Sequence, residues 1–574
     1  MRTVSFFVAV VVIATLAVTP LTGLAGDAMH LEEINFYNSP QDIFRGSPSG
    51  WNKTDTQTYG ISPSDWYLTW QDNPALTELQ GDRAFIASMF YSGSYSDFSS
   101  NMYILSGDPI FNPGYRAAET GETYIGNSAG TDLGFLMTLS DSATFGALFH
   151  YRYDGMLGKG SASVERWRSA FTLYDLSYIE SVRRSDSHGT GLTLLYDIDF
   201  SDALSLGFDL TYLFITENTN YDENMIEYEY TGGAGGALIG IDEDKIDRET
   251  VFNTHRLSPT IGISFTSTDA FTLNLAVTTD ILFGGVEKNM DAAARADGLP
   301  FNPSDYRERL DGGNLFGYGF EAEADAEVAL TNALSLAFLT SGSFHDTSWD
   351  INGDVTGWFE PDVYRSIYLE PGMMEYEYEE RTWHLTTGLG INYALSKIVL
   401  HSLFSYTRWE RDSAYYMEDI ITPGLTTIPY SIFTQRTSEE LDILALKVGA
   451  TMDISSSISM DLCLGYSVGW GDYSLYEYIH SDAFTTEDGM FILLDETDTF
   501  HELSAAVSMI ITPVERLSIT LSAMGTFPLD GKSYPLTGSM INNNTLSSWQ
   551  GDYFIDCDSS TWNYGGTISI EYRF

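Results

Sequence analysis

Four carboxylates alternate with apolar residues along one short stretch of the chain, at Glu321, Glu323, Asp325 and Glu327. In an extended strand, side chains two positions apart lie on the same face, about 6 to 7 Å from one another. Like charges at that separation repel each other unless water or cations lie between them. The residue types therefore indicate a wet, acidic strand face, and the chemistry that such a face offers is contact with cations.

The positions between these carboxylates are apolar, so residues 316–330 predict a strand with two unlike faces. The apolar face holds Phe316, Tyr318, Phe320, Ala322, Ala324, Ala326, Val328 and Leu330. Asp209 and Asp461 fall on the polar face of two similar stretches, residues 204–212 and 458–468. Strands of this kind need apolar surroundings on one side and water on the other.

The sequence offers no recognisable catalytic set, and we predict that the chain is not an enzyme. It contains no GxSxG or HExxH motif and no phosphate-binding glycine loop. Residues 242–247 do not form an EF-hand loop, because Ile246 and Asp247 replace a ligand and the required glycine. We expect no cofactor. Divalent cations bound by the acidic segment 472–500 are one hypothesis, and a solvated acidic loop is the alternative.

Short turn signals recur along the chain at intervals of 57 to 67 residues. They are Ser140-Asp141-Ser142, Ser201-Asp202-Ala203, Thr268-Asp269-Ala270, Thr331-Asn332-Ala333, Leu395-Ser396-Lys397, Ser455-Ser456-Ser457 and Thr512-Pro513-Val514. Each signal is flanked on both sides by an alternating stretch of about ten residues, the length that a tilted strand needs to cross a bilayer. Longer acidic segments separate one such pair from the next.

Tight turns on one side and long loops on the other are typical of outer-membrane barrels, whose short turns face the periplasm. We therefore predict an all-β fold, a transmembrane antiparallel up-and-down β-barrel. Seven turns join fourteen strands, and strands near residues 84–92 and 565–574 bring the count to sixteen, with fourteen as the alternative. Tyrosines at the expected strand exits, among them Tyr151, Tyr212, Tyr406 and Tyr466, predict an interfacial aromatic girdle.

Both ends of the chain carry export signals. Residues 4–18 form a short apolar run that is followed by small residues, as in a secretory signal peptide. We predict a cleaved signal peptide over residues 1–25, a separate segment over 26–81 and a barrel over 82–574, in a bacterial outer membrane. The alternating C-terminal octet TISIEYRF ends on Phe574 and resembles the C-terminal signature of outer-membrane proteins, which implies recognition by the barrel assembly machinery.

The composition narrows the choice of partners. The formal charge of -52 would repel nucleic acid and anionic surfaces. Hydrophobic residues make up 43% of the chain, which argues against disorder. Cys463 and Cys557 are too few for a disulfide framework, and whether they pair is left open. The expected partners are outer-membrane lipid and lipopolysaccharide, the assembly machinery and a small-molecule solute, with no nucleic acid.

Residues 26–81 do not alternate cleanly, but they are rich in aromatic side chains such as Trp66 and Trp70. This composition predicts a segment housed in the lumen or at the periplasmic mouth of the barrel. It leads through Asn73, Pro74 and Ala75 into the first strand. Here the sequence resembles the long-chain fatty-acid outer-membrane transporter family (FadL type), whose members carry an Asn-Pro-Ala motif in an N-terminal hatch. The family's barrels have fourteen strands, whereas the turn count here favours sixteen.

The resemblance implies a hatch or plug over residues 26–81, passive uptake of hydrophobic small molecules such as long-chain fatty acids, and an opening in the barrel wall. Two other functions agree with the same residues. An open lumen lined by the six carboxylates named above would make a cation-preferring diffusion porin. The same carboxylates could instead pair with a plug or with bases across the lumen, such as Arg152 and Lys447. If the acidic loops carry the function instead, the protein would be a surface adhesin or a cation-bridging structural protein of the outer membrane.

Overall fold

The computed structural model describes residues 72–77, 83–106, 115–168, 173–231, 237–267, 270–296, 306–362, 365–420, 431–481, 489–529, 532–544 and 547–574. Nearly all of these residues are β-strand, and one short 3-10 helix, η3 (Pro74–Leu76), precedes the first strand. The strands are β1 (Arg83–Ser106), β2 (Tyr115–Ser140), β3 (Ala143–Arg168), β4 (Leu173–Ser201), β5 (Leu204–Thr231), β6 (Ala237–Thr266), β7 (Phe271–Ala296), β8 (Tyr306–Thr331), β9 (Leu334–Asp362), β10 (Arg365–Leu395), β11 (Ile398–Ile420), β12 (Ser431–Ser455), β13 (Ile458–Ser481), β14 (Gly489–Val514), β15 (Leu517–Pro528), β16 (Lys532–Asn544) and β17 (Ser547–Arg573).

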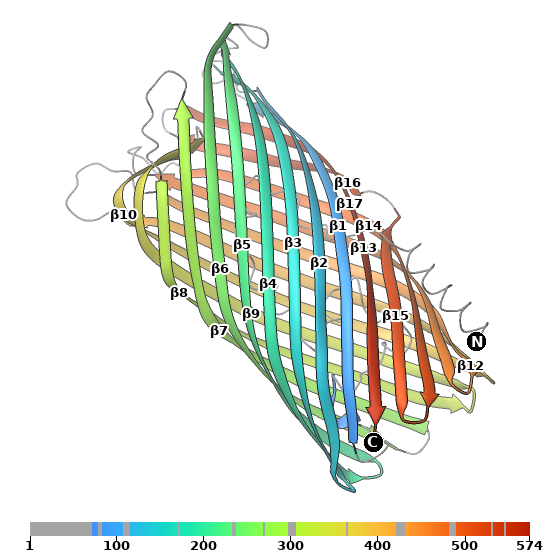
Figure 1. The fold of residues 1–574 in the computed structure, drawn as a ribbon. Coiled ribbons are helices and arrows are strands. Elements are labelled where there is room, and N and C mark those ends of the chain that lie inside the picture. The colour runs from blue at the N-terminus through green and yellow to red at the C-terminus, as the bar shows by residue number, and fades with distance from the viewer. Residues whose placement is uncertain are drawn as a thin grey trace.

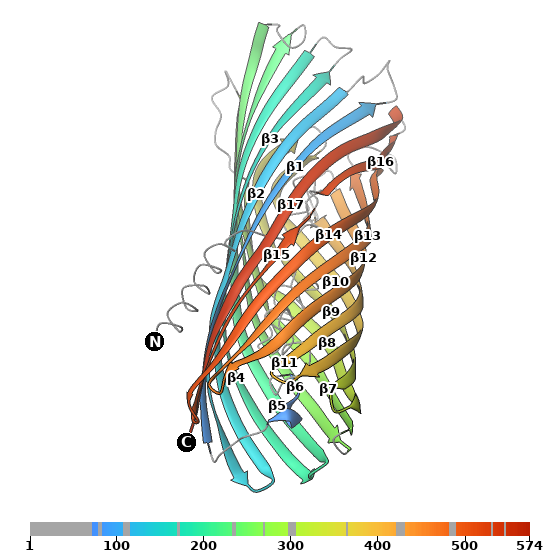
Figure 2. The same cartoon turned by 90° about the vertical axis from the view of Figure 1, so that its right-hand side faces the viewer.

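The strands form one closed antiparallel barrel, in which the first and last strands lie side by side (Figures 1 and 2). β15 and β16 share one position between β14 and β17, so the seventeen segments make sixteen strands. The predicted all-β transmembrane barrel of sixteen strands is therefore confirmed, and the alternative of fourteen strands is wrong. Closure matters because unpaired backbone groups cannot be satisfied in hydrocarbon.

The C-terminal octet is the strand that closes the barrel. Tyr572 of β17 pairs with Phe85 of β1, and the ladder between the two strands continues to the pair Gly551 and Ser106. At the lower end, the backbone N–H of Phe574 donates to the carbonyl of Arg83 at 2.9 Å. The side chains of Tyr572 and Phe574 are exposed on the outer face. The alternation of the octet thus serves both the seam and the lipid-facing surface.

The predicted turns connect the strands with one correction. The turns at 140–142, 201–203, 331–333, 395–397 and 455–457 lie between consecutive strands as expected, and residues 268–269 lie outside the described residues. The last turn is formed by Glu515 and Arg516, not by residues 512–514, which still belong to β14. Pro513 misled the prediction, because it occupies a register shift between Ile511 and Val514, where a missing N–H is tolerated.

Most strands are far longer than a bilayer requires. Apart from β15 and β16, they run from 23 residues in β11 to 31 residues in β10, whereas about 9 to 11 residues suffice to cross the hydrocarbon. Acidic stretches such as 227–230 and 375–380 are therefore strand and not loop, in β5 and β10. The barrel wall continues well beyond the membrane on the side opposite the tight turns.

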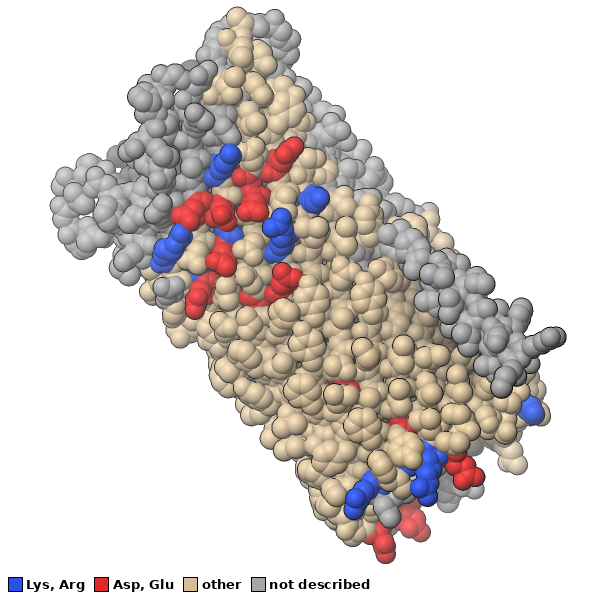
Figure 3. All heavy atoms as spheres, viewed as in Figure 1, with Lys and Arg blue, Asp and Glu red and all other residues tan. Residues whose placement is uncertain are grey.

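The outer face carries an apolar belt in the part of the strands next to the tight turns. Leu389, Leu464 and Met89 expose 64%, 63% and 64% of their surface, which would be costly in water and suits contact with lipid. On the face shown in Figure 3, charged side chains gather above and below a wide zone in which few charged atoms are visible. None of the described residues forms a helix that is long and apolar enough to cross a membrane.

Two irregularities interrupt the wall beyond the apolar belt. β14 pairs with β15 from Glu502 and with β16 up to Asp495, and residues 496–500 have no ladder partner on that side among the described residues. In β8 the register with β9 shifts between Arg309 and Asn314. Gly312 lies within this shift with a φ of 78°, a conformation that residues with a Cβ rarely adopt.

An added positive charge should destabilise the barrel more on the outer face of the wall than on the inner face. Val448 lies on the outer face of β12 and exposes 47% of its surface, whereas Ala445 of the same strand faces inward. Val448→Arg should lower the free energy of unfolding in lipid vesicles by about 2 kcal/mol, because it places a cation within hydrocarbon. Ala445→Arg is the matched control and should cost clearly less. Urea titration of the refolded variants measures both, and equal costs would contradict the assignment of faces.

Candidate transport path

The carboxylates singled out in the sequence lie on the inner face of the barrel. Glu321, Glu323, Asp325 and Glu327 alternate with the outward Phe320, Ala322, Ala324, Ala326 and Val328 on β8, and Asp209 and Asp461 lie on the inner faces of β5 and β13. Glu323, Asp325 and Asp461 are buried, at 9%, 3% and 5% exposure. The structure therefore places these six side chains on the lumen side of the wall.

Two of these carboxylates accept hydrogen bonds from neutral neighbours. The Nδ2 of Asn274 donates to Asp325 at 3.0 Å, and Ser264 in turn donates to Asn274 at 2.8 Å. Glu327 accepts from the hydroxyl of Ser335 and, at 3.2 Å, from the Nδ2 of Asn392. Hydroxyl and amide donors thus orient these two carboxylates. The lower part of the inner face carries a row of hydrogen-bonded acidic side chains.

The Asn-Pro-Ala motif docks on the inner wall of the barrel. Asn73 is fully buried, and its Nδ2 donates at 3.1 Å to each of two backbone carbonyls, those of Ile263 in β6 and Leu275 in β7. Its Oδ1 accepts from the N–H of Ala75 at 3.0 Å, which caps η3. One amide thus fastens the chain before the first strand to two strands of the wall.

Two glycines of the wall make room for the motif. A Cβ added to Gly262 of β6 would lie 1.9 Å from the Oδ1 of Asn73. A Cβ added to Gly207 of β5 would lie 2.2 Å from the backbone N of Ala75. Real Cβ atoms essentially never approach other atoms this closely, so any side chain at either position would displace the motif. Most of residues 26–81 lie outside the described residues, and the hatch predicted there is not described beyond this docking point.

A chain of polar contacts crosses the inner face of five neighbouring strands, β1 to β5. Ser88 donates to Asp132 at 3.1 Å, and the Nδ1 of His150 lies 2.7 Å from the same carboxylate. The Nε2 of His150 lies 2.8 Å from the hydroxyl of Thr193, which contacts Thr211 at 2.7 Å. The wall is polar at this level, and its groups hydrogen-bond from strand to strand around the lumen.

An ion pair bridges an interruption between β6 and β7. Pro259 lacks an N–H, and the ladder pairs stop at Leu257 and resume at Thr260. Across this interval the Nη2 of Arg256 lies 2.8 Å from Asp280, which also accepts from Ser258. The side chains of Arg256 and Asp280 are almost completely buried. Contacts between side chains thus hold the two strands together where the backbone cannot.

Beyond the apolar belt, the inner face of the barrel becomes apolar. In β10, Leu389 and Ile391 face outward near the tight turn, whereas Tyr376 and Tyr378 face inward in the upper part, at 3% and 5% exposure. The strand keeps the same alternation throughout, but its apolar residues face outward near the turn and inward in the upper part. We call the buried residues of this region the inner apolar cluster. It consists of Leu213, Ile215, Ile246, Phe252, Leu282, Val286, Met290, Leu310, Leu315, Trp349, Ile351, Tyr376, Tyr378 and Tyr415.

Aromatic rings from separate strands meet within the inner apolar cluster. Phe252 of β6 and Trp349 of β9 have two strands between them, yet their ring centroids lie 6.1 Å from each other, edge to face. Trp349 also stacks on Tyr378 of β10 at 5.8 Å, with an angle of 20° between the ring planes. Three strand spacings span about 14 Å along a sheet. The side chains therefore converge away from the wall toward the interior of the barrel.

Two charged groups are held against these rings. The Nζ of Lys288 lies 3.5 Å from the centroid of Tyr376, a cation–π contact. Glu380 accepts from the hydroxyl of Tyr378 at 2.5 Å and pairs with Arg411 at 3.0 Å. Burial and the adjacent Glu380 raise the pKa of Tyr378 far above its ordinary value, so the phenol stays protonated and donates. The cluster is apolar with a few fixed polar groups, a composition common in binding sites for small molecules.

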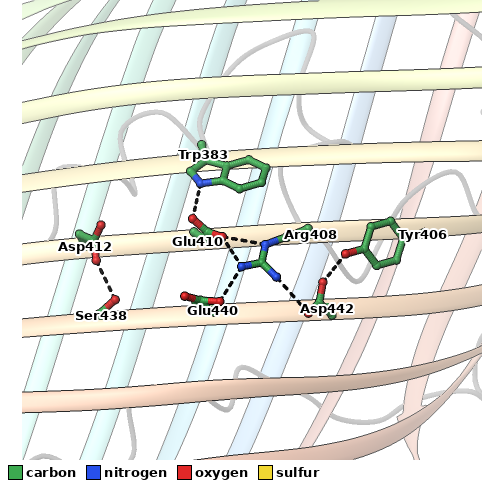
Figure 4. A network of polar contacts seen from close by, with 8 residues as sticks. All are labelled: Trp383, Tyr406, Arg408, Glu410, Asp412, Ser438, Glu440 and Asp442. Carbon is green, nitrogen blue, oxygen red and sulfur yellow. Dashed lines mark hydrogen bonds and ion pairs between the residues drawn. The ribbon is translucent and has the colours of Figure 1, made fainter.

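The outer face carries charged side chains just above Tyr406. In Figure 4, Arg408 of β11 contacts Glu410, Glu440 and Asp442, with Glu440 at 2.5 Å and Asp442 at 3.3 Å. The hydrogen bond with Glu410 is the main cause that raises the pKa of Arg408 above its ordinary value. Trp383 donates to Glu410, and Tyr406 donates to Asp442. The guanidinium is thus surrounded by carboxylates of the same face.

Sequence reasoning missed the inner apolar cluster, although part of its signal is readable. The stretch EYEYEE, residues 375–380, alternates carboxylates with tyrosines and predicts a strand, but the tyrosines could have faced either way. Among the described residues, no group of three or more His, Cys, Asp or Glu side chains could hold a metal ion. The side chains of the acidic segment 472–500 lie outside the described part of the structure, so the cation hypothesis stays a prediction. Cys463 is a buried free thiol on β13.

Comparison with known proteins gives weak structural likenesses. No protein-family model and no curated protein sequence matches the chain. A Pseudomonas aeruginosa FadL homologue aligns at 13% identity over 92% of this chain and 98% of its own, with a TM-score of 0.36. The Pseudomonas putida toluene transporter TodX aligns at 10% identity over 88% and 93%, with a TM-score of 0.30. The Escherichia coli outer membrane protease OmpT aligns at 12% identity over 65% and 98%, with a TM-score of 0.21. These values carry no argument about function, which must come from the residues of this chain.

The docking of the motif can be tested with one methyl group. Gly262→Ala should displace Asn73, because the new Cβ would lie 1.9 Å from its Oδ1. The expected result is faster protease cleavage within residues 26–81 of the refolded protein, by about tenfold if roughly 1.4 kcal/mol of docking energy is lost. Gly189→Ala is the matched control on β4, where the nearest atom would be 3.7 Å away. Equal cleavage rates in both variants would contradict the docking.

Proposed function

We propose that this barrel takes up hydrophobic small molecules passively across the outer membrane. The observation that carries the proposal is the inner apolar cluster, because a barrel that passes water and ions has a polar lumen. A nonpolar solute that leaves water gains about 25 cal/mol for each Å² of apolar surface that it buries. The apolar rings on the inner wall, such as those of Trp349 and Tyr378, offer such a solute a place to bind.

The layers of the lumen support a direction of passage. A solute would meet the inner apolar cluster first and then the polar level around His150 and Asp132. Glu323 lies at that same level, eight residues before Thr331, whereas Asp325 and the docked Asn73 lie closer to the tight turns. Acidic side chains would oppose a free fatty carboxylate and leave a neutral solute unaffected. The proposed substrates are therefore nonpolar molecules, and a long-chain fatty acid would place its carboxylate near Lys288.

Residues 26–81 would act in this proposal as a hatch that is fastened through Asn73. The two hydrogen bonds of Asn73 and the seats at Gly207 and Gly262 support a fixed attachment at one end of the segment. Such a hatch would block bulk ion flow while the apolar path above it remains accessible. The proposal is one of transport and not of catalysis.

Removal of a central ring should weaken binding of a hydrophobic solute. Trp349→Ala deletes the ring that meets both Phe252 and Tyr378, and the affinity for a naphthylamine dye should fall about tenfold. Ser348→Ala changes the neighbouring residue, which faces outward, and should leave the affinity unchanged. Dye fluorescence in vesicles that contain the full refolded chain measures the affinity. Equal affinities in the two variants would contradict binding at the inner apolar cluster.

A second candidate function is cation-preferring diffusion, and the row of inward carboxylates on β8 favours it. Replacing Glu321, Glu323 and Glu327 by Gln and Asp325 by Asn should then shift the reversal potential in a salt gradient toward zero. Single-channel recording of the refolded barrel measures this potential. A silent wild-type barrel, or an unchanged potential in the variant, would contradict the porin and leave hydrophobic uptake as the account to pursue.

A further inference from the structure

A tyrosine recurs at one fixed place on the outer face. Tyr151, Tyr212, Tyr406 and Tyr466 each lie nine residues after the last residue of a tight turn, namely after Ser142, Ala203, Lys397 and Ser457. Because about 9 to 11 residues cross the hydrocarbon, these rings lie where the strands leave the lipid. They form part of the predicted aromatic girdle at the end opposite the tight turns.

Three of these tyrosines each form a hydrogen bond with a histidine. The hydroxyl of Tyr151 lies 3.2 Å from the Nδ1 of His188, that of Tyr212 lies 2.7 Å from the Nδ1 of His255, and that of Tyr466 lies 2.7 Å from the Nδ1 of His501. Each histidine stands on the next strand, opposite the residue two positions beyond its tyrosine. The same diagonal pair therefore occurs on three separate hairpins.

The shared geometry leaves one nitrogen of each ring available. When the tyrosine hydroxyl donates to Nδ1, the proton of the neutral imidazole is on Nε2, which is then a donor. Among the described residues, the Nε2 atoms of His188, His255 and His501 make no hydrogen bond. Aromatic neighbours fix the orientation of the rings, as where His255 stacks on Phe283 at 5.2 Å. Three oriented N–H donors thus lie at one level of the outer face.

On the fourth hairpin, the tyrosine pairs with a carboxylate and not with a histidine. Tyr406 donates to Asp442, which occupies the position of the histidines and is held by Arg408. A girdle tyrosine can therefore find an acceptor for its hydroxyl group without a histidine. A carboxylate at this position cannot donate to an anion, and Arg408 is already surrounded by three carboxylates. The hairpin of Tyr406 is a natural comparison within the same chain.

We propose that His188, His255 and His501 bind the phosphate groups of lipid headgroups in the outer leaflet. The three rings are continuous with the lipid-facing belt, so headgroups lie next to them in the membrane. Hydrogen bonds from N–H donors to an ionised phosphate are about twice as strong as those between neutral groups. The formal charge of -52 repels anionic lipid in general, so a preference for the anionic phosphate monoester of phosphatidic acid over the zwitterionic headgroup of phosphatidylcholine requires local donors.

The test uses the full chain refolded into phosphatidylcholine vesicles at neutral pH. Quenching of tryptophan fluorescence by brominated lipids gives the affinity for phosphatidic acid relative to phosphatidylcholine. We expect the wild-type protein to prefer phosphatidic acid by about fivefold. The triple variant H188F, H255F and H501F keeps aromatic rings but loses the donors, and its preference should disappear. Tyr406→Phe, on the hairpin without histidine, should keep the preference of the wild type.

Two results would overturn the proposal. One is the absence of a preference in the wild-type protein, or the same preference in the triple variant. The other is loss of the preference on addition of inorganic phosphate at constant ionic strength, since the rings would then bind free phosphate. A second readout needs no substitution. In histidine-labelled wild-type protein, the Nε2 resonances of the three outer rings should shift when phosphatidic acid is added, and that of His150 in the lumen should not.

Discussion

The requirement that every backbone polar group be paired inside hydrocarbon governs the rest of this structure. It forces sixteen strands to close on themselves through β17 and β1, and it excludes an open edge. Closure gives the wall an inside and an outside, and the period of two assigns each side chain to one of them. Where the backbone cannot supply the bond, as at Pro259, the contacts of Asp280 with Arg256 and Ser258 take its place.

The strands continue beyond the hydrocarbon, and β10 keeps the same alternation of side chains throughout, but the surroundings of the outer face change from lipid to water. Apolar residues such as Leu389 therefore face outward below the girdle, and apolar residues such as Tyr378 face inward above it. The upper part is built like a water-soluble barrel on top of a membrane barrel. One continuous wall thus has a lipid-facing exterior, an apolar inner cluster and a polar lower lumen, which together suit the passage of hydrophobic solutes.

Much of the lower barrel could be predicted from the sequence, because contact with lipid requires apolar residues at alternate positions of each strand. Alternation around the tight turns predicted the strand count, the outward Val328 and the inward Glu323. The upper barrel could not be read in the same way, since the pattern around Tyr376 fits either face until the closed wall is known. The docking of Asn73 onto Gly207 and Gly262 joins segments about 130 and 190 residues apart, and local residue patterns do not encode such a contact.

The most direct test of this account is a crystal of the full chain grown with a brominated alkane, with the anomalous signal of bromine used to locate the solute. The account predicts bromine density inside the barrel, beside Trp349 and Tyr378 of the inner apolar cluster. Density confined to the lipid-facing belt around Leu389 and Leu464, with none among the inner rings, would contradict it. In that case the inner apolar cluster would be only the packing core of the upper wall.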